Sequence, residues 1–370
     1  MTTPESSDHD FEAQVGAYAE RLFETGLAAL EAVTVSLGRE LGLYGHLAAG
    51  DGVTPLDLAA EAGIHPRYAR EWLEQQAAAG LIDLQADADH ADQRRYALSP
   101  AAQECLLRPE SLASVGPLMD LLPSIGRVFP TLLDAFRTGG GIPYADYAIH
   151  DAQGDFNRPA FLNLLASDWL PAVPGVADRL AAGPARVAEI GCGEGWAAIA
   201  IAKAWPDVEV DGFDNDEASI AAARKHAAET GVGDRVRFEL VDVTRELPAS
   251  IATGKYDIVL AFEMIHDLAR PQAALSTMRT LGKADAVHLV VDEKVAESFE
   301  APTDNPVERL FYAASVLHCL PVGMADSPSV GTGTVMRPAT FKTYADEAGF
   351  SSVDILPIQN DLFRFYRLAA

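Results

Sequence analysis

Glycines and carboxylates lie along this chain where a nucleotide-like ligand would need them. The stretch Val187–Gly195 joins a strand-like run to three closely spaced glycines, Gly191, Gly193 and Gly195, and Asp214 ends the next strand-like run. A glycine turn lets the backbone approach a ligand, and the helix that follows offers unpaired N–H groups to its anionic end. An acid after the second strand can accept ribose hydroxyls. The pattern predicts a site for a nucleoside cofactor.

The glycine spacing and one acid favour a particular cofactor. Gly195 comes one residue too early for the G-x-G-x-x-G fingerprint of dinucleotide sites. Glu189, just before the turn, would repel a pyrophosphate, but it suits a ligand that carries an ammonium and a sulfonium. We therefore expect S-adenosylmethionine (SAM) rather than NAD.

Further cofactor contacts are expected at the ends of the later strands, because ligands of doubly wound sheets bind outside the carboxyl ends of the strands. The residues at these positions are Asp214 and Asn215 after the second strand, Asp242 and Val243 after the third, and Phe262 and Glu263 after the fourth.

His266 and Asp267 follow the fourth strand and could carry acid–base chemistry. A hydroxyl is a poor nucleophile at neutral pH, and a histidine can take its proton as the hydroxyl attacks a sulfonium methyl. The alternative is that His266 only begins a helix that Asp267 caps.

The elements that must position these residues alternate from Arg186 onward. We expect strands at 186–190, 208–213, 236–240, 256–262 and 286–292, with helices at 196–204, 217–230 and 271–281 between them. Such alternation predicts a Rossmann-like, doubly wound α/β sheet. After a helix at Pro338–Ala348, the runs Val353–Pro357 and Leu362–Leu368 are joined by a turn so short that they must form an antiparallel hairpin.

The N-terminal part has the pattern of a winged helix. Behind a disordered leader we expect a helix over Phe11–Leu47, then helices at Leu56–Ala62 and Pro66–Ala79. The runs Leu81–Leu84 and Tyr96–Leu98 complete the pattern as a hairpin wing. Residues 1–110 contain 7 basic and 19 acidic residues, a balance of 7 − 19 = −12. This acidity argues against DNA binding, because phosphate backbones are bound by clustered Lys and Arg.

Composition sets the wider limits. The chain has 370 residues and a formal charge of −26, so more than one domain is expected and a polyanionic partner is not. The cysteines, Cys105, Cys192 and Cys319, have no metal-binding spacing, and we predict no metal. Residues 1–10 lack the features of a signal peptide, and no apolar run reaches membrane length, so we expect a cytoplasmic protein.

We expect three regions: a winged-helix dimerisation domain at 1–108, a helical linker and substrate lid at 109–183, and a cofactor-binding catalytic domain at 184–370. Aromatic and amide side chains of the lid suit a mostly apolar pocket with a few polar anchors. The predicted substrate contacts are Tyr144, Tyr147, Asn157, Phe161 and Trp169, together with Phe311 from the segment Asn305–Gly331, for which we expect neither a simple helix nor a strand.

With these motifs the chain resembles class I SAM-dependent methyltransferases that carry an N-terminal winged-helix domain. Among these it is similar to the small-molecule O-methyltransferases of secondary metabolism and to uncharacterised bacterial winged-helix methyltransferases. The resemblance implies a homodimer, a small-molecule substrate, adenine binding at Asp242, and a catalytic base at His266, paired with Asp267 and oriented by Glu293. A second carboxylate of the family is missing, because Ala339 stands at its position, and Leu268 replaces a common aromatic residue.

Other functions stay open at this stage. Nitrogen, sulfur or carbon acceptors would be methylated by proximity without a base, and His266 would then only position the substrate. A cofactor-sensing DNA-binding regulator and a methyltransferase fold that catalyses another reaction are further alternatives.

Overall fold

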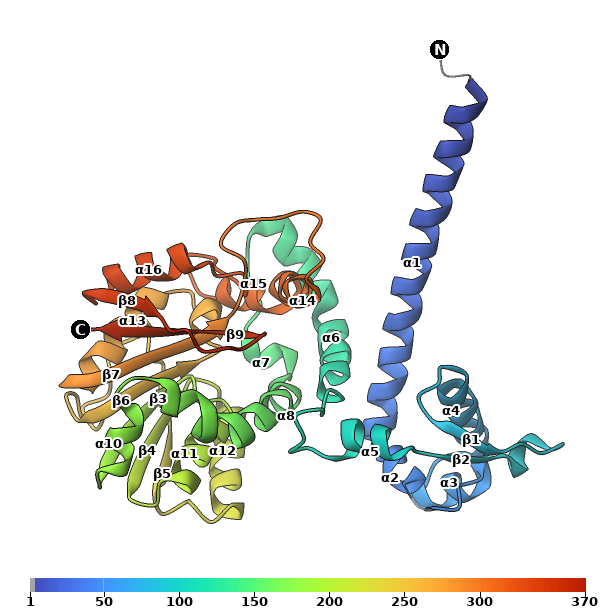
Figure 1. Cartoon of the computed structure of the whole chain (residues 1–370), viewed down its shortest axis with the longest axis horizontal. Coiled ribbons are helices and arrows are strands. Elements are labelled where there is room, and N and C mark those ends of the chain that lie inside the picture. The colour runs from blue at the N-terminus through green and yellow to red at the C-terminus, as the bar shows by residue number, and fades with distance from the viewer. Residues whose placement is uncertain (1–3, 49) are drawn as a thin grey trace. The chain divides into compact units, whose positions relative to one another are not determined.

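The computed structural model describes residues 4–48 and 50–370, and the chain divides into two compact units, Met1–Pro123 and Ser124–Ala370. Figure 1 shows the helices and strands of both units. Each unit has a hydrophobic core of its own. Among the described helices, none combines the length and the apolar character needed to cross a membrane.

The first unit is a winged helix behind a long helix. Its elements are α1 (Pro4–Glu40), α2 (Leu43–Leu47), α3 (Pro55–Ala62), α4 (Pro66–Ala78), β1 (Asp83–Ala86), η1 (Ala91–Gln93), β2 (Arg95–Ala97) and α5 (Pro100–Leu107). Thr54 caps α3 by accepting the N–H of Asp57, and β1 pairs antiparallel with β2. The predicted helix-turn-helix and wing are therefore confirmed.

The long N-terminal helix differs from its predicted bounds. It ends at Glu40 rather than continuing to Leu47, because Gly42 takes a left-handed conformation with φ 66° and α2 begins after it. At the other end the helix starts at Pro4, so the disordered leader is wrong for residues 4–10; residues 1–3 lie outside the described residues.

The two arginines of α4 are engaged in ion pairs within the first unit. Arg67 pairs with Glu71 of the same helix, and Arg70 Nη1 lies 3.2 Å from Asp92 Oδ1. In the wing, Arg94 pairs with Glu74 at 2.8 Å. These carboxylates neutralise the basic groups that a recognition helix would offer to DNA phosphates.

The second unit begins within a long helix and builds a helical segment before its sheet. These elements are α6 (Pro117–Thr138), α7 (Tyr144–Tyr147), α8 (His150–Ala160), the π-helical η2 (Phe161–Trp169), α9 (Leu170–Ala172) and α10 (Val176–Ala181). The sheet region follows with β3 (Ala185–Ile190), α11 (Trp196–Ala204), β4 (Val208–Asp214), α12 (Glu217–Glu229), β5 (Val236–Leu240), β6 (Tyr256–Phe262), η3 (Ile265–Asp267), α13 (Pro271–Leu281), β7 (Gly282–Glu293), α14 (Pro306–Ala314), π-helical η4 (Ser315–Cys319), α15 (Leu320–Gly323), α16 (Pro338–Glu347), β8 (Ser352–Ile355) and β9 (Phe363–Ala369).

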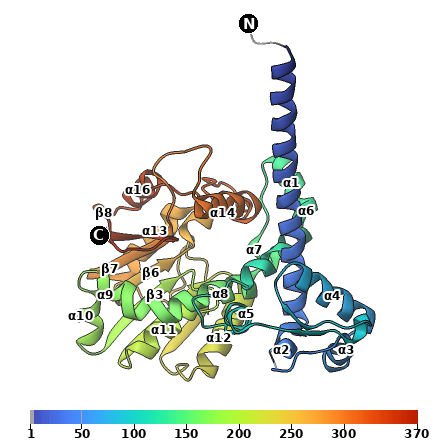
Figure 2. The ribbon, with the colours of Figure 1, turned by 45° about the vertical axis from the view of Figure 1, so that its right-hand side comes forward.

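The seven strands form one sheet in the order β5-β4-β3-β6-β7-β9-β8. Strands β3 to β7 are parallel, whereas β9 runs antiparallel to both β7 and β8. The doubly wound sheet and its terminal antiparallel hairpin are thus confirmed. One face is covered by η2, α10, α11 and α12 and the other by α13 and α16, as the turned view of Figure 2 also shows.

The segment Asn305–Gly331 departs most from its prediction, because its first two thirds are helical. Asn305 caps α14 by accepting the N–H of Val307 at 3.0 Å, and Pro306 occupies the first turn. The helix then widens into the π-helical η4, which shifts the register of the apolar positions. That shift removes the regular 3.6-residue period by which a helix is recognised in a sequence.

Candidate functional site

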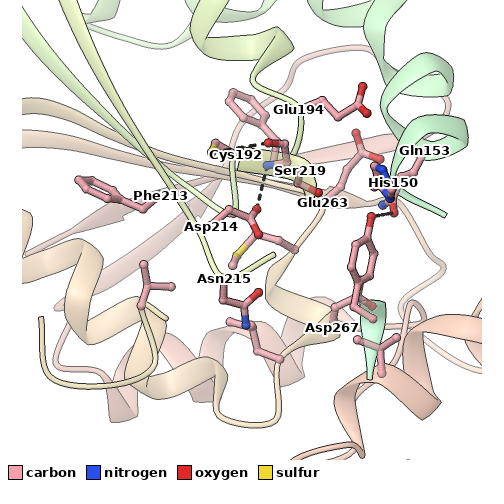
Figure 3. Close-up of a pocket in the computed structure, with 18 of the residues that line it drawn as sticks. His150, Gln153, Cys192, Glu194, Phe213, Asp214, Asn215, Ser219, Glu263 and Asp267 are labelled. Atoms are coloured by element: carbon pink, nitrogen blue, oxygen red, sulfur yellow. Dashed lines mark hydrogen bonds between the residues drawn. The ribbon is translucent and has the colours of Figure 1, made fainter. Parts of the chain in front are cut away.

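A cavity of about 350 Å³ opens at the carboxyl ends of β3, β4 and β6, where the strand order of the sheet reverses (Figure 3). Its walls come from the glycine turn, from the loops after β4, β5 and β6, and from α7, α8 and the end of α15. This is the place where doubly wound sheets bind their ligands. From the predicted cofactor set it is lined by Glu189, Gly191, Gly193, Asp214, Asn215, Asp242, Val243, Phe262 and Glu263.

The glycine turn has two structural roles. Gly191 donates its N–H to the Phe213 carbonyl at 2.7 Å, and a Cβ at this position would lie 2.6 Å from Met264 Cγ. Gly195 does not line the cavity; with φ 79° it lets α11 approach the sheet, and a Cβ built on it overlaps the Phe238 ring. Gly191 therefore leaves space beside Met264 that a side chain would fill, and Gly195 permits close packing of α11 against the sheet.

Glu189 is a buried carboxyl group that faces the cavity without a full set of partners. It is 2% exposed, and its Oε2 has no hydrogen-bond partner among the described residues. Burial raises the pKa of Glu189 to about 8, against the lowering effect of a backbone hydrogen bond from Ala198. A buried acceptor of this kind needs a donor from a ligand, and a cationic donor fits best.

Asp214 is fixed by the backbone around it. Its Oδ2 accepts the N–H of Gly193 at 2.8 Å and its Oδ1 accepts that of Asp216 at 2.9 Å. Burial raises the pKa of Asp214, although these backbone hydrogen bonds oppose the shift. Each carboxylate oxygen has a second lone pair available, so the group can also accept a pair of hydroxyls.

Asp242 begins the loop after β5 and is held differently. It accepts hydrogen bonds from the backbone and the hydroxyl of Thr244, and Arg245 Nε lies 2.7 Å from its Oδ2. Although burial opposes it, the bonds from Thr244 and Arg245 lower the pKa of Asp242 and keep it ionised. Asp242 therefore presents a charged acceptor at the cavity edge.

His266 lies behind the cavity wall, enclosed by carboxyl groups. It is 1% exposed and does not line the cavity. Its Nδ1 donates to Asp292 Oδ1 at 2.7 Å and lies 2.9 Å from Glu293 Oε2, while its Nε2 lies 3.2 Å from Asp267 Oδ1. Asp267 does line the cavity and so connects the histidine to it.

The charges of this cluster make His266 strongly basic. Burial by itself would lower its pKa, but Glu293, Asp292 and Asp267 together outweigh burial and raise the pKa of His266 well above 6.5. For Asp267 the balance is reversed: burial opposes ionisation, yet the His266 cation lowers its pKa. Burial also raises the pKa of Glu293 well above 4.5, although the His266 charge lowers it, so His266 and Glu293 together retain a proton at neutral pH.

The predicted substrate residues separate into two groups. Tyr144, Asn157 and Phe161 line the cavity, and the Tyr144 hydroxyl donates to Gln153 Oε1 at 3.0 Å. The other three do not line it: Tyr147 donates to the Leu317 carbonyl, Trp169 packs edge-on against Phe161, Phe363 and Phe365, and Phe311 is buried in α14.

Sequence reasoning missed several residues of the site: one behind the cavity wall and three that line the cavity. The contact between Asp292 and His266 was not predicted, because the family resemblance pointed only to Glu293, the next residue at the end of β7. Glu194 stands inside the glycine turn and could have been noticed as a second acid there. His150 and Gln153 come from α8, whose approach to the glycine turn depends on Gly154, since a Cβ at Gly154 overlaps the Glu194 carboxyl group.

The fold and the site define a class I methyltransferase architecture, and the residues present fit SAM. The unpartnered Glu189 oxygen suits an ammonium, and Asp214 suits ribose hydroxyls. The glycine turn has no side chains at Gly191 and Gly193, which leaves space for a ligand beside these two carboxyl groups.

Comparisons with known proteins agree with this class. Residues 184–319 match the model of a methyltransferase domain, and residues 28–108 match that of the Rv2258c-like winged helix-turn-helix domain. The chain is 28% identical over 223 residues to the ubiquinone biosynthesis O-methyltransferase of Pseudomonas aeruginosa (strain LESB58), a match that covers 59% of this chain and 85% of that protein.

Two solved structures share the fold over most of the chain. Human N-acetylserotonin methyltransferase in complex with SAM matches with a TM-score of 0.69 at 16% identity, over 95% of this chain and 97% of that one. The N,N-8-amino-8-demethyl-D-riboflavin dimethyltransferase of Streptomyces davawensis matches with a TM-score of 0.61 at 20% identity, over 95% and 99%. The chain therefore carries a SAM-dependent methyltransferase domain behind an N-terminal Rv2258c-like winged helix-turn-helix domain.

Proposed function

We propose that this enzyme methylates a small organic molecule at a hydroxyl oxygen, with His266 as the general base. The observation that carries the proposal is the contact between His266 and Asp267, which links a strongly basic imidazole to the wall of the cofactor cavity. The O-methyltransferase among the chain's relatives supports an oxygen acceptor. SAM supplies the electrophilic methyl group, and the chain's own residues must orient the acceptor and remove its proton.

The surrounding carboxyl groups determine the role of each nitrogen of the His266 ring. Asp292 and Glu293 hold the Nδ1 proton, so Nε2 is the nitrogen left to receive a proton from the acceptor. Asp267 lies next to Nε2 at the cavity wall, where it can orient a hydroxyl toward the ring. As the proton arrives, the same three carboxyl groups stabilise the imidazolium that forms.

The raised pKa of His266 sets the pH dependence of this chemistry. At neutral pH the ring already carries its second proton, and it must lose that proton before it can act as a base. The rate of methyl transfer should therefore rise with pH from neutral into the alkaline range.

Replacement of His266 tests the proposal. His266→Gln should lower turnover by roughly two to four orders of magnitude and leave cofactor affinity, measured by calorimetry, nearly unchanged. His90→Gln is the matched control, because His90 is exposed and lies in the first unit. An unchanged turnover in His266→Gln together with a product methylated on nitrogen would instead favour a base-independent amine acceptor, as the name of the riboflavin-type dimethyltransferase suggests for that relative.

We also propose that the first unit forms a homodimer. Large apolar side chains of α1 are exposed at intervals of mostly three or four residues, among them Tyr18 at 65%, Leu22 at 59% and Leu30 at 70%. An apolar stripe of this length on one helix is typical of a surface that another helix covers. The ion-paired arginines of α4 further support an assembly role over DNA binding.

A further inference from the structure

We propose that the acceptor side of the cavity selects a substrate that carries a protonated amine. This inference rests on the proposed function, because it concerns the acceptor of the same cavity, but it is independent of which atom receives the methyl group. It follows from which charged groups line the cavity and which of them already have partners.

The cavity wall is strongly acidic. Seven carboxyl-bearing residues line it, and the described lining contains no Lys or Arg. These residues are Glu189, Glu194, Asp214, Asp242, Glu263, Asp267 and Asp326. The ionised carboxylates of this wall, Asp242 and Asp267 among them, would repel an anionic acceptor such as a carboxylic acid and attract a cation.

The cofactor accounts for only part of this charge. Its ribose and its ammonium fit Asp214 and Glu189, and Asp242 is already paired with Arg245. Figure 3 shows Glu194, Glu263 and Asp267 on the side of the cavity that faces His150 and Gln153, away from Asp214 and Asn215. These three acids therefore lie where they could contact the acceptor rather than the ribose of the cofactor.

Two of these acids have no Lys or Arg within ion-pair distance in the described part of the chain. Asp267 has His266 at 3.2 Å, and the more exposed Asp326 has Arg270 at 3.9 Å. Glu194 is 7% exposed, and its basic neighbour is the ring of His226, 4.0 Å away.

Glu263 is the second acid without a Lys or Arg partner. Burial dominates its electrostatics, the charge of His266 is the main opposing influence, and Asn157 donates a hydrogen bond to it. Glu263 is therefore a carboxyl group that an ammonium from the acceptor could pair with directly.

Burial raises the pKa of both Glu194 and Glu263 to about 8. A hydrogen bond with Asp151 adds to the rise of the pKa at Glu194, whereas the charge of His266 opposes it at Glu263. An ammonium group bound between these side chains would lower both pKa values, and each unit of lowering corresponds to about a tenfold gain in affinity. A neutral acceptor has no charge that would lower these pKa values, so its affinity does not increase in this way.

Matched phenols that differ only in charge test the inference. Binding of tyramine, 4-ethylphenol and 3-(4-hydroxyphenyl)propanoate to the full chain, loaded with S-adenosylhomocysteine, can be measured by calorimetry. We expect tyramine to bind at least about tenfold more tightly than 4-ethylphenol, with the propanoate weakest. Equal affinities, a preference for the propanoate, or no tyramine binding at millimolar concentration would overturn the inference.

Glu263→Gln sharpens the test, because its readout is a ratio. The substitution should remove most of the tyramine advantage, which is the ratio of tyramine affinity to 4-ethylphenol affinity measured in the same variant; Glu297→Gln, at an exposed position, should leave this ratio as in the wild type. An unchanged tyramine advantage in Glu263→Gln would count against the inference. Product analysis separates the two proposals. O-methylation without a preference for amines would contradict only the selection of a protonated amine. N-methylation of a preferred amine would contradict only the proposed oxygen acceptor.

Discussion

The state of Glu189 predicts that cofactor binding depends on pH. In the free protein burial raises the pKa of this carboxyl group to about 8, so at pH 7 it is about nine-tenths protonated. The ammonium of SAM should bind only the ionised carboxylate. Binding must therefore release a proton, and the affinity must rise with pH up to about 8.

The magnitude follows from the fraction of binding-competent protein. When only about one molecule in ten is ionised, the observed affinity at pH 7 falls about tenfold below that of the ionised form, or about 1.4 kcal/mol. Between about pH 6 and about pH 7.5, where the cofactor's ammonium keeps its proton, the affinity should change about tenfold per pH unit.

Isothermal titration calorimetry in two buffers of different ionisation enthalpy measures both quantities. We expect release of about nine-tenths of a proton at pH 7. Glu189→Gln should bind more weakly and lose most of the pH slope, whereas Glu297→Gln should behave as the wild type. An affinity that falls with rising pH, or a slope that survives in Glu189→Gln, would refute the reasoning.

Four further predictions concern other parts of the molecule. Asp292→Asn removes one of the charges that raise the pKa of His266, so the rising limb of the pH–rate profile should move to lower pH; a limb that stays in place would disprove the coupling. Burial lowers the pKa of His288 from 6.5 to about 4, so the stability that its neutral form provides is lost as pH falls through this window, by about 2 kcal/mol between pH 7 and pH 5; urea unfolding of His288→Leu should show a smaller loss. Gly195→Ala should lower the free energy of unfolding by roughly 1–3 kcal/mol, seen as a lower melting temperature. Leu30→Glu should shift the mass measured by light scattering from dimer to monomer, and a wild-type monomer at micromolar concentration would contradict the proposed assembly.

Much of the fold could be predicted because its signals are local. Alternating strand and helix patterns, the glycine turn and the terminal hairpin each lie within a few dozen residues. SAM could be predicted because the position of Gly195 departs from the dinucleotide fingerprint and because the Glu189 carboxyl group faces the cavity. The π-helix at Ser315–Cys319 could not be predicted, since its wider turn interrupts the 3.6-residue period by which a helix is recognised in a sequence.

The details of the candidate site depended on contacts between distant segments. The sequence placed His266 and Glu293 together through a family resemblance, but nothing local showed that Asp292 also contacts the ring or that the ring would be fully buried. Tyr147 and Trp169 are aromatic residues on the segment that lines the cavity with Tyr144 and Phe161, yet they pack away from it. Which face of a lid helix meets the ligand is decided by tertiary packing, and composition does not reveal it.

The most direct test of the central claim is transfer of a trideuterated methyl group from labelled SAM to a phenolic amine, with the product identified by mass spectrometry and NMR. We expect a product labelled on oxygen, formed together with an equal amount of S-adenosylhomocysteine. Formation of this product should slow by roughly two orders of magnitude or more in His266→Gln. Label on nitrogen, or O-methylation at an undiminished rate in His266→Gln, would contradict the central claim.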